Sequence, residues 1–154
     1  MINRRSLRAQ AMVEFALALP VFLMVLYGLI EASRLIFIVT TVSSAAREGA
    51  RYGSAGGGMY RPVIAQYEDC AAIRTAAKRV GFLLNLQDAD VTIAYDHGTD
   101  GTDFATCPTT GFTPPTAAVV GGDRILVTVS YNYSPILVNF LPFTNKTLSS
   151  PRTA

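Results

Sequence analysis

The sequence predicts an α+β protein with a long apolar N-terminal helix, a second helix and a small antiparallel sheet. Three observations support this prediction. Residues 11–30 form an apolar run that a single acid interrupts, and residues 70–84 carry apolar side chains at helical spacing. Residues 123–133 alternate between apolar and polar side chains, as a half-buried strand does. We therefore expect three segments: a basic leader 1–9, a long helix 10–54, and an α+β domain 55–154.

Composition supports one apolar segment joined to one small domain. The chain has 154 residues, of which 50% are apolar and 16% are charged, whereas soluble domains average about 25% charged residues. Between Ala11 and Val39, 23 of 29 residues are apolar. The rest of the chain is long enough for a single hydrophobic core. This distribution excludes a plain cytosolic enzyme.

The charges are also unevenly distributed. Arg4, Arg5 and Arg8 precede the apolar run, and no acid lies among residues 1–9. Residues 40–154 hold nine basic and nine acidic residues. A neutral domain lacks the clustered cations that neutralise phosphates, so we expect no nucleic-acid partner. The arginines are typical of the cytoplasmic flank of a membrane span, which would place residues 40–154 outside the cytoplasm.

The apolar run 11–30 has the length of a membrane span. At 1.5 Å per residue its 20 residues cover the roughly 30 Å of a bilayer's hydrocarbon core. Three interpretations remain open: a cleaved secretory signal, a generic single-pass anchor, or the N-terminal helix of a type IV prepilin. The run is too long for an ordinary signal, because signals have an apolar region of about 7–15 residues.

Glu14 favours the prepilin interpretation. A cut between Ala9 and Gln10 would make Glu14 the fifth residue of the mature chain. The new amine and this carboxylate could then pair, within one subunit or between neighbours, and set the axial register of an incoming subunit. The alternative is an acid that reaches the membrane interface. Pro20 removes a helical hydrogen bond, which predicts a kink or a locally melted turn.

Small residues continue the helical pattern beyond the span. Ala45, Gly49 and Gly53 recur at intervals of four, a spacing that lets two backbones approach closely. We expect one helix from about residue 8 to 54, whose outer half packs on the domain or on a neighbouring helix. Glu31 and Arg34 are spaced to pair. The remaining charged residues form a polar face for solvent or for subunit contacts: Arg47, Glu48 and Arg51.

The domain is predicted from three further patterns. A second helix over about 66–84 has an apolar stripe consisting of Cys70, Ile73, Ala77, Val80 and Leu84. Arg74, Lys78 and Arg79 are expected outside this stripe. Strands are predicted at 91–95, at 123–133 and, as an edge strand, at 146–153, with a turn or short hydrophobic stretch at 136–143. Residues 97–117, rich in Thr, Gly and Pro, are predicted as loop.

The two cysteines, Cys70 and Cys107, are expected to form a disulfide, because an even pair in a small domain outside the cytoplasm usually does. Two free buried thiols are the alternative. His97, near Asp96, Asp100 and Asp103, is expected to be a polar loop residue, since the acids lack the EF-hand spacing. We expect no catalytic site, metal or cofactor.

Several motifs resemble one known family. Residues 13–20 read VEFALALP, residues 28–31 read GLIE, and residues 45–52 read AAREGARY. Together these blocks resemble the TadE-like pseudopilins of tight-adherence (Tad, Flp, type IVc) pilus systems. The family also tends to have a Val-x-Val strand, similar to residues 125–131. One position differs: the peptidase of these systems prefers glycine before the cut, and this chain has Ala9.

The resemblance implies a pilin-like, non-enzymatic structural subunit. It would sit in the inner membrane with its domain outside the cytoplasm and then enter an extracellular, adhesive pilus. The implied partners are further copies of the chain, other pilins and pseudopilins, a prepilin peptidase and an inner-membrane assembly platform. The alternative is a permanently anchored accessory protein of a pilus or secretion apparatus. Use of the chain with its leader uncleaved also stays open.

Overall fold

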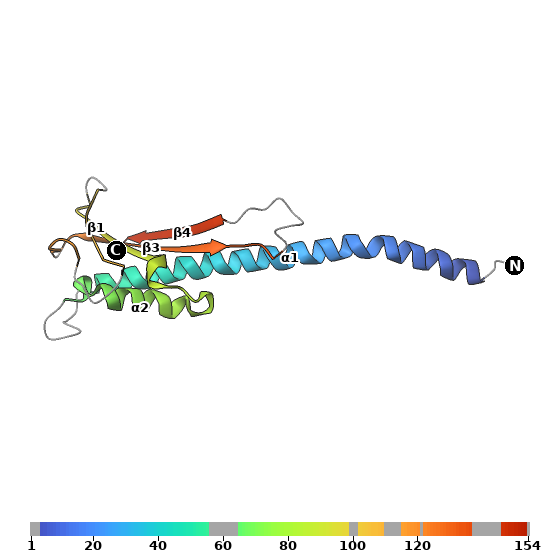
Figure 1. Ribbon diagram of the computed structural model, residues 1–154, viewed down its shortest axis with the longest axis horizontal. Helices are drawn as coiled ribbons and strands as arrows, with labels where there is room; N and C mark the ends of the chain where they lie inside the picture. Colours follow the sequence, from blue (N-terminus) through green and yellow to red (C-terminus); the bar gives the residue numbers. More distant parts are fainter. Residues whose placement is uncertain are drawn as a thin grey trace. The chain divides into compact units, whose positions relative to one another are not determined.

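The computed structural model describes residues 4–55, 65–98, 102–109, 115–120, 122–136 and 146–153 (Figure 1). The chain divides into two compact units, Met1–Ile36 and Phe37–Ala154. Helix α1, Arg4–Ser54, runs through the first unit and supplies the first element of the second. A second helix and an antiparallel sheet follow in the second unit. The predicted α+β class is therefore confirmed.

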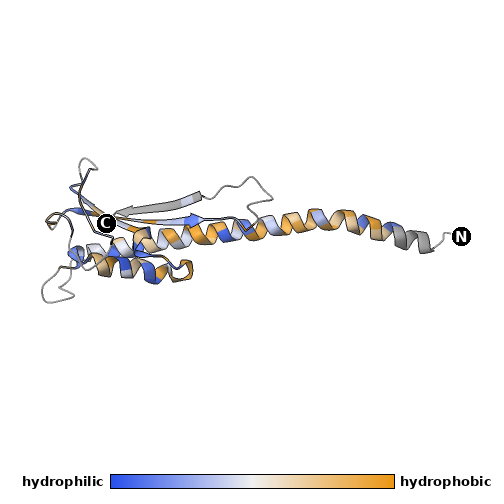
Figure 2. Cartoon of the chain, viewed as in Figure 1, coloured by the Kyte–Doolittle hydropathy of each residue, from blue (hydrophilic) through white to orange (hydrophobic). Residues whose placement is uncertain are grey.

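The first unit is the apolar part of α1. All described residues from Gln10 to Leu26 are exposed, and Figure 2 shows that apolar residues prevail along this part of the helix. Within the described residues, one helix is long and apolar enough to cross a membrane by length and composition, over Gln10–Ser54. The helix continues through Pro20, and local melting of this turn when a subunit leaves the bilayer stays a prediction. Proline has no N–H, so the carbonyl of Ala16 lacks its usual helical donor.

The sheet of the second unit has four antiparallel strands in the order β2-β1-β3-β4. Their bounds are Val91–Asp96 for β1, Asp103–Thr106 for β2, Arg124–Tyr133 for β3 and Lys146–Thr153 for β4. Strands β1 and β3 pair at the centre, and β4 lies at an edge as predicted. The region 137–143 lies outside the described residues.

One face of the central strands forms the core. Ile93 pairs with Val127 and Tyr95 pairs with Ile125 across β1 and β3. All four side chains are at most 3% exposed. Side chains two apart on a strand point to the same face, so the apolar alternation read from the sequence builds this face. The helices cover it, with their buried side chains in the same hydrophobic cluster.

Helix α2, Cys70–Val80, is shorter than predicted. At its start the side chain of Asp69 accepts a hydrogen bond from the backbone N–H of Ala72 at 2.9 Å. It ends at Val80 and its C-cap is Gly81, where an added Cβ would lie 2.3 Å from the Leu86 side chain. The 3-10 turns η1, Gln66–Glu68, and η2, Phe82–Leu84, account for the rest of the predicted range.

The prediction of loop over residues 97–117 is wrong at β2, Asp103–Thr106. This strand has only four residues, two of them Asp and Thr, so its sequence carries little alternation. Its pairing with β1 supplies the backbone hydrogen bonds that its side chains do not predict, with Tyr95 opposite Ala105. Strand β2 is therefore a tertiary feature of the sheet.

Candidate functional site

The predicted processing and register residues all lie in α1. Gln10 and Glu14 are both exposed, and residues four apart lie on the same face of a helix, about one turn from each other. Ala9 precedes them in the same helix, and Pro20 follows. The helix therefore places position 10 and the Glu14 carboxylate on one face. Their roles in processing and in register stay predictions.

The small residues of α1 lie where three elements of the second unit meet. Ala45 is fully buried. A Cβ added at Gly49 would lie 3.1 Å from Val127 of β3 and 3.3 Å from Ala77 of α2. At Gly53 an added Cβ would lie 2.4 Å from the Ile125 side chain. These glycines let the helix backbone approach β3 and α2 closely, within the chain's own fold.

A large side chain at Gly49 is expected to destabilise the second unit. We expect Gly49→Leu to lower the free energy of unfolding by about 1–3 kcal/mol, as overpacking of a core does. The gain in helix propensity over glycine, up to about 1 kcal/mol, partly offsets this loss. Ser44→Leu, at an exposed position of the same helix, is the matched control. Denaturant titration of the full chain in detergent, followed by near-ultraviolet circular dichroism, measures both. Equal stability of the two variants would contradict the packing role.

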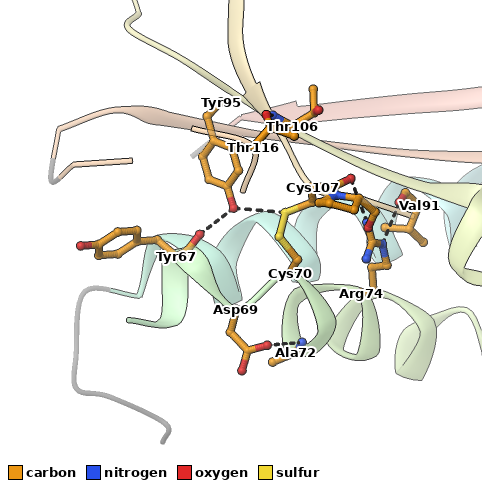
Figure 3. The surroundings of a disulfide bond; sticks show 11 residues. Tyr67, Asp69, Cys70, Ala72, Arg74, Val91, Tyr95, Thr106, Cys107 and Thr116 are labelled. Carbon is orange, nitrogen blue, oxygen red and sulfur yellow. Dashed lines mark hydrogen bonds between the residues drawn. A yellow bond between two sulfur atoms is a disulfide. The ribbon is translucent and has the colours of Figure 1, made fainter. Parts of the chain in front are cut away.

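The disulfide between Cys70 and Cys107 is present (Figure 3), with the two Cα atoms 5.8 Å apart. It joins the first residue of α2 to the residue after β2, and both half-cystines are buried. The buried Tyr95 lies beside it and donates its hydroxyl hydrogen to the Tyr67 carbonyl at 2.6 Å. Burial raises the pKa of the Tyr95 hydroxyl. The phenol therefore remains a neutral hydrogen-bond donor next to the disulfide.

The prediction that Arg74 lies outside the apolar stripe of α2 is wrong, because Arg74 is buried among the core residues of this face. It is 3% exposed. Its guanidinium donates hydrogen bonds to the carbonyls of Cys107, at 3.1 Å, and of Pro108, and also to the carbonyl of Val91 (Figure 3). Burial lowers the pKa of this guanidinium. Arg74 thus fastens the segment after β2 to α2 on the same side as the disulfide.

The sequence pattern did not predict the burial of Arg74, because its hydrogen-bond partners are backbone carbonyls of distant segments. An α-helical position next to an apolar stripe gives no sign that a distant backbone segment will present acceptors there. A signal was present only in its spacing, four residues after Cys70, which puts both side chains on one face of α2. Its chemistry is structural, since five N–H donors and no acceptor suit it to binding carbonyls.

A polar cluster lies where the last residue of β1, Asp96, pairs with the first residue of β3, Arg124. The Asp96 carboxylate accepts two hydrogen bonds from the Arg124 guanidinium, at 2.7 and 2.8 Å. His97 Nδ1 lies 2.9 Å from Asp123 Oδ1, and its ring stacks on Phe104 with centroids 4.1 Å apart. His97 is therefore held by partners from two other segments, which the sequence did not predict. Among the residues that the structure describes, no three potential ligands are grouped for a metal.

Acid is expected to weaken this cluster. The hydrogen bonds from Arg124 hold the pKa of Asp96 below its usual range, and the Val120 N–H does the same for Asp123. A carboxyl group with a depressed pKa in the folded state stabilises the fold above its unfolded pKa, near 4. That contribution disappears as the pH falls through the folded value. Thermal unfolding of the full chain in detergent should therefore lose stability from about pH 5 downward.

Asp96→Asn separates this effect from general acid denaturation. The variant should be less stable than the wild type at pH 7 and should depend less on pH below about 5. The matched control is Asp103→Asn, at an exposed carboxyl on β2. If Asp96→Asn keeps the full acid dependence, the ion pair with Arg124 is not its source.

The polar face of α1 carries ion pairs. Glu48 accepts hydrogen bonds from Arg51 at 2.9 and 3.0 Å, and Arg79 of α2 lies 3.8 Å away. Glu31 and Arg34 pair at 3.4 Å, as their spacing predicts. Exposed pairs of this kind contribute at most about 1 kcal/mol. The packing of apolar and small residues therefore contributes more to stability in this region than these ion pairs do.

The fold and these residues define a class: an α+β protein with a membrane-compatible N-terminal helix and a disulfide-bonded domain. The family model described as TadE-like protein matches residues 9–51. Over this segment the chain is similar to the TadE-like family, in agreement with the resemblance read from the motifs. No curated protein and no solved structure matches the chain.

Proposed function

We propose that this protein is a pilin-like subunit of a Tad or type IV-like pilus, main or minor. In this proposal α1 anchors the chain in the inner membrane until assembly. The same helix then packs against equivalent helices in an extracellular filament used for surface adhesion. The observation that carries the proposal is the exposed apolar segment of α1 that coincides with the TadE-like match over residues 9–51.

Physical chemistry supports two environments for this segment. Its exposed side chains include Met12 at 77%, Leu17 at 72% and Phe22 at 63%. Contiguous apolar surface of this extent requires lipid or protein around it. A bilayer covers it before assembly, and neighbouring helices cover it in a filament. The folded second unit keeps its own core in both environments, since its buried side chains form one cluster within Phe37–Ala154.

The N-terminal residues would direct assembly. Cleavage before Gln10 creates an amine on the same face of α1 as Glu14. A carboxylate in an apolar environment is costly without a partner, so pairing with an amine favours one axial position of the incoming subunit. The enzyme that cuts, the assembly platform and the other pilins are the partners that this route requires.

Filaments sheared from cells test the proposal. We expect the chain in the sheared fraction, with Gln10 as the first residue by N-terminal sequencing. Ala9→Gly should be cut at least as efficiently, because it restores the preferred residue, and Ala9→Lys should remain uncut in the membrane. Absence of the wild-type chain from filaments would instead assign it to a permanently anchored accessory role. A start at Met1 in filaments would refute processing but keep the subunit role.

A further inference from the structure

Helix α2 and strand β3 end on the same side of the second unit. Ile73 and Ile125 lie next to Gly53, whereas Ala77 and Val127 lie next to Gly49. Both α2 and β3 therefore run from the Gly53 end of α1 back toward Phe37, where this unit begins. The turn η2 at the end of α2 and residues 134–136 after β3 consequently lie at the Phe37 end, called here the proximal end (Figure 1).

The exposed apolar side chains of this unit gather at the proximal end. Phe82 is 70% exposed and Leu83 is 63% exposed, next to each other in η2. Phe37 and Val39 at the start of the unit are each 46% exposed, and Ile136 after β3 is 63% exposed. Of the large apolar residues with high exposure in the described part of this unit, Val120 alone lies elsewhere. The proximal end is thus an apolar rim, whereas the opposite end carries the polar cluster around Asp96.

Charge does not explain this rim. Lys78 in the last turn of α2 pairs with Asp88, and Arg79 lies near Glu48. Glu48 is shared between Arg51 and Arg79, so Lys78 is the basic residue here that is neutralised by its own acid. Exposed Phe and Leu side chains beside basic residues suit the interfacial layer of a bilayer, where interfacial segments bury Phe and Leu and keep Lys and Arg on their polar face.

The chain itself brings the rim to the bilayer. With residues 11–30 filling the hydrocarbon core, only six residues, 31–36, separate the core from Phe37. As helix they extend about 9 Å. The headgroup layer on each side is about 5–8 Å thick. Phe37, the first residue of the second unit, is therefore tethered near the outer boundary of this layer.

We propose that the apolar rim rests on the lipid interface, with Phe82 and Leu83 inserted among the headgroups while the chain is in the membrane. This inference rests on the membrane anchorage in the proposed function and adds a second lipid contact to it. The contact holds the domain against the bilayer before assembly. Release of Phe82 and Leu83 then accompanies extraction of the subunit.

The chain has no tryptophan, so single-tryptophan variants report on each position. The full chain is reconstituted in vesicles of phosphatidylethanolamine and phosphatidylglycerol, with or without lipids brominated near the headgroup. We expect Phe82→Trp and, as a second reporter, Leu83→Trp to emit at shorter wavelength than in water and to lose most of their intensity to brominated lipid. Thr75→Trp, on the exposed side of α2, is the matched control and should keep the emission of tryptophan in water.

Phe22→Trp, with brominated lipid at mid-chain depth, separates this inference from the anchorage. If Phe22→Trp is quenched while both reporters in η2 behave like Thr75→Trp, the rim contact is overturned and the anchorage stands. If Phe22→Trp is not quenched, the anchorage itself fails, and the inference with it. Phe82→Trp could instead emit at shorter wavelength without being quenched by brominated lipid, and lose this shift as the chain is diluted in lipid. That result would identify a second copy of the chain as the partner and overturn the lipid contact.

Discussion

Replacing Cys70 and Cys107 together with serine is expected to destabilise the second unit by about 2–4 kcal/mol. The bond closes a long loop, with a sequence separation of 37, so its loss returns considerable freedom to the unfolded chain. Two polar hydroxyls also enter a buried site next to Tyr95. A loss of this size is a large fraction of the 5–15 kcal/mol that small domains typically have.

Denaturant unfolding of the full chain in detergent measures this effect, with near-ultraviolet circular dichroism of the tyrosines as the signal. Reduced wild-type protein is the control, because it loses the bond without any substitution. Arg74→Met in both backgrounds completes a double-mutant cycle. Since Arg74 and the disulfide hold the same segment at Cys107, we expect the two losses to be non-additive. Equal unfolding midpoints for oxidised and reduced wild type would show that the bond contributes nothing.

Glu14→Gln is expected to abolish or strongly reduce incorporation into filaments while membrane insertion stays normal. Removing one partner of a buried ion pair costs about 3–5 kcal/mol. That cost corresponds to a loss of roughly a hundredfold or more in the equilibrium for adding a subunit. Insertion should not suffer, because a neutral amide is less costly in lipid than a carboxylate.

Quantitative immunoblots of the sheared and membrane fractions measure both results. Glu31→Gln is the matched control, since it removes another carboxylate of α1 whose partner, Arg34, lies on the same helix. We expect Glu31→Gln to enter filaments nearly as the wild type does. Wild-type levels of Glu14→Gln in filaments would refute a role for this carboxylate in register.

Sequence periodicity predicted the elements whose side chains meet the core directly. The stripe on α2 and the alternation in β3 appear as buried Ile73, Ala77, Val127 and Val129. Whether a side chain is buried depends largely on its own hydropathy and on the face of the element where it lies. The spacing of apolar residues along the chain is therefore enough to predict it. The same holds for the apolar segment of α1, whose length and composition are compatible with a membrane span, and for the disulfide, which an isolated pair of cysteines predicts.

The polar contacts required the tertiary structure. The partners of Arg74 lie 17 to 34 residues away, and those of Asp96 and His97 lie up to 28 residues away. Such contacts leave no periodic trace in the sequence. Strand β2 belongs to the same group, because its partner strand provides the pairing that makes it a strand.

By itself, the sequence determined the α+β class, the apolar helix with Glu14 near its start, the disulfide pair and the similarity of residues 9–51 to TadE-like proteins. The tertiary structure alone decided that Gly49 and Gly53 serve close packing within the fold, that Arg74 is buried, and that Phe82 and Leu83 lie at the end where α1 enters the domain. The physical reason is distance along the chain. Hydropathy and spacing act locally, whereas close packing, buried hydrogen bonds and shared surfaces join segments that only folding brings together.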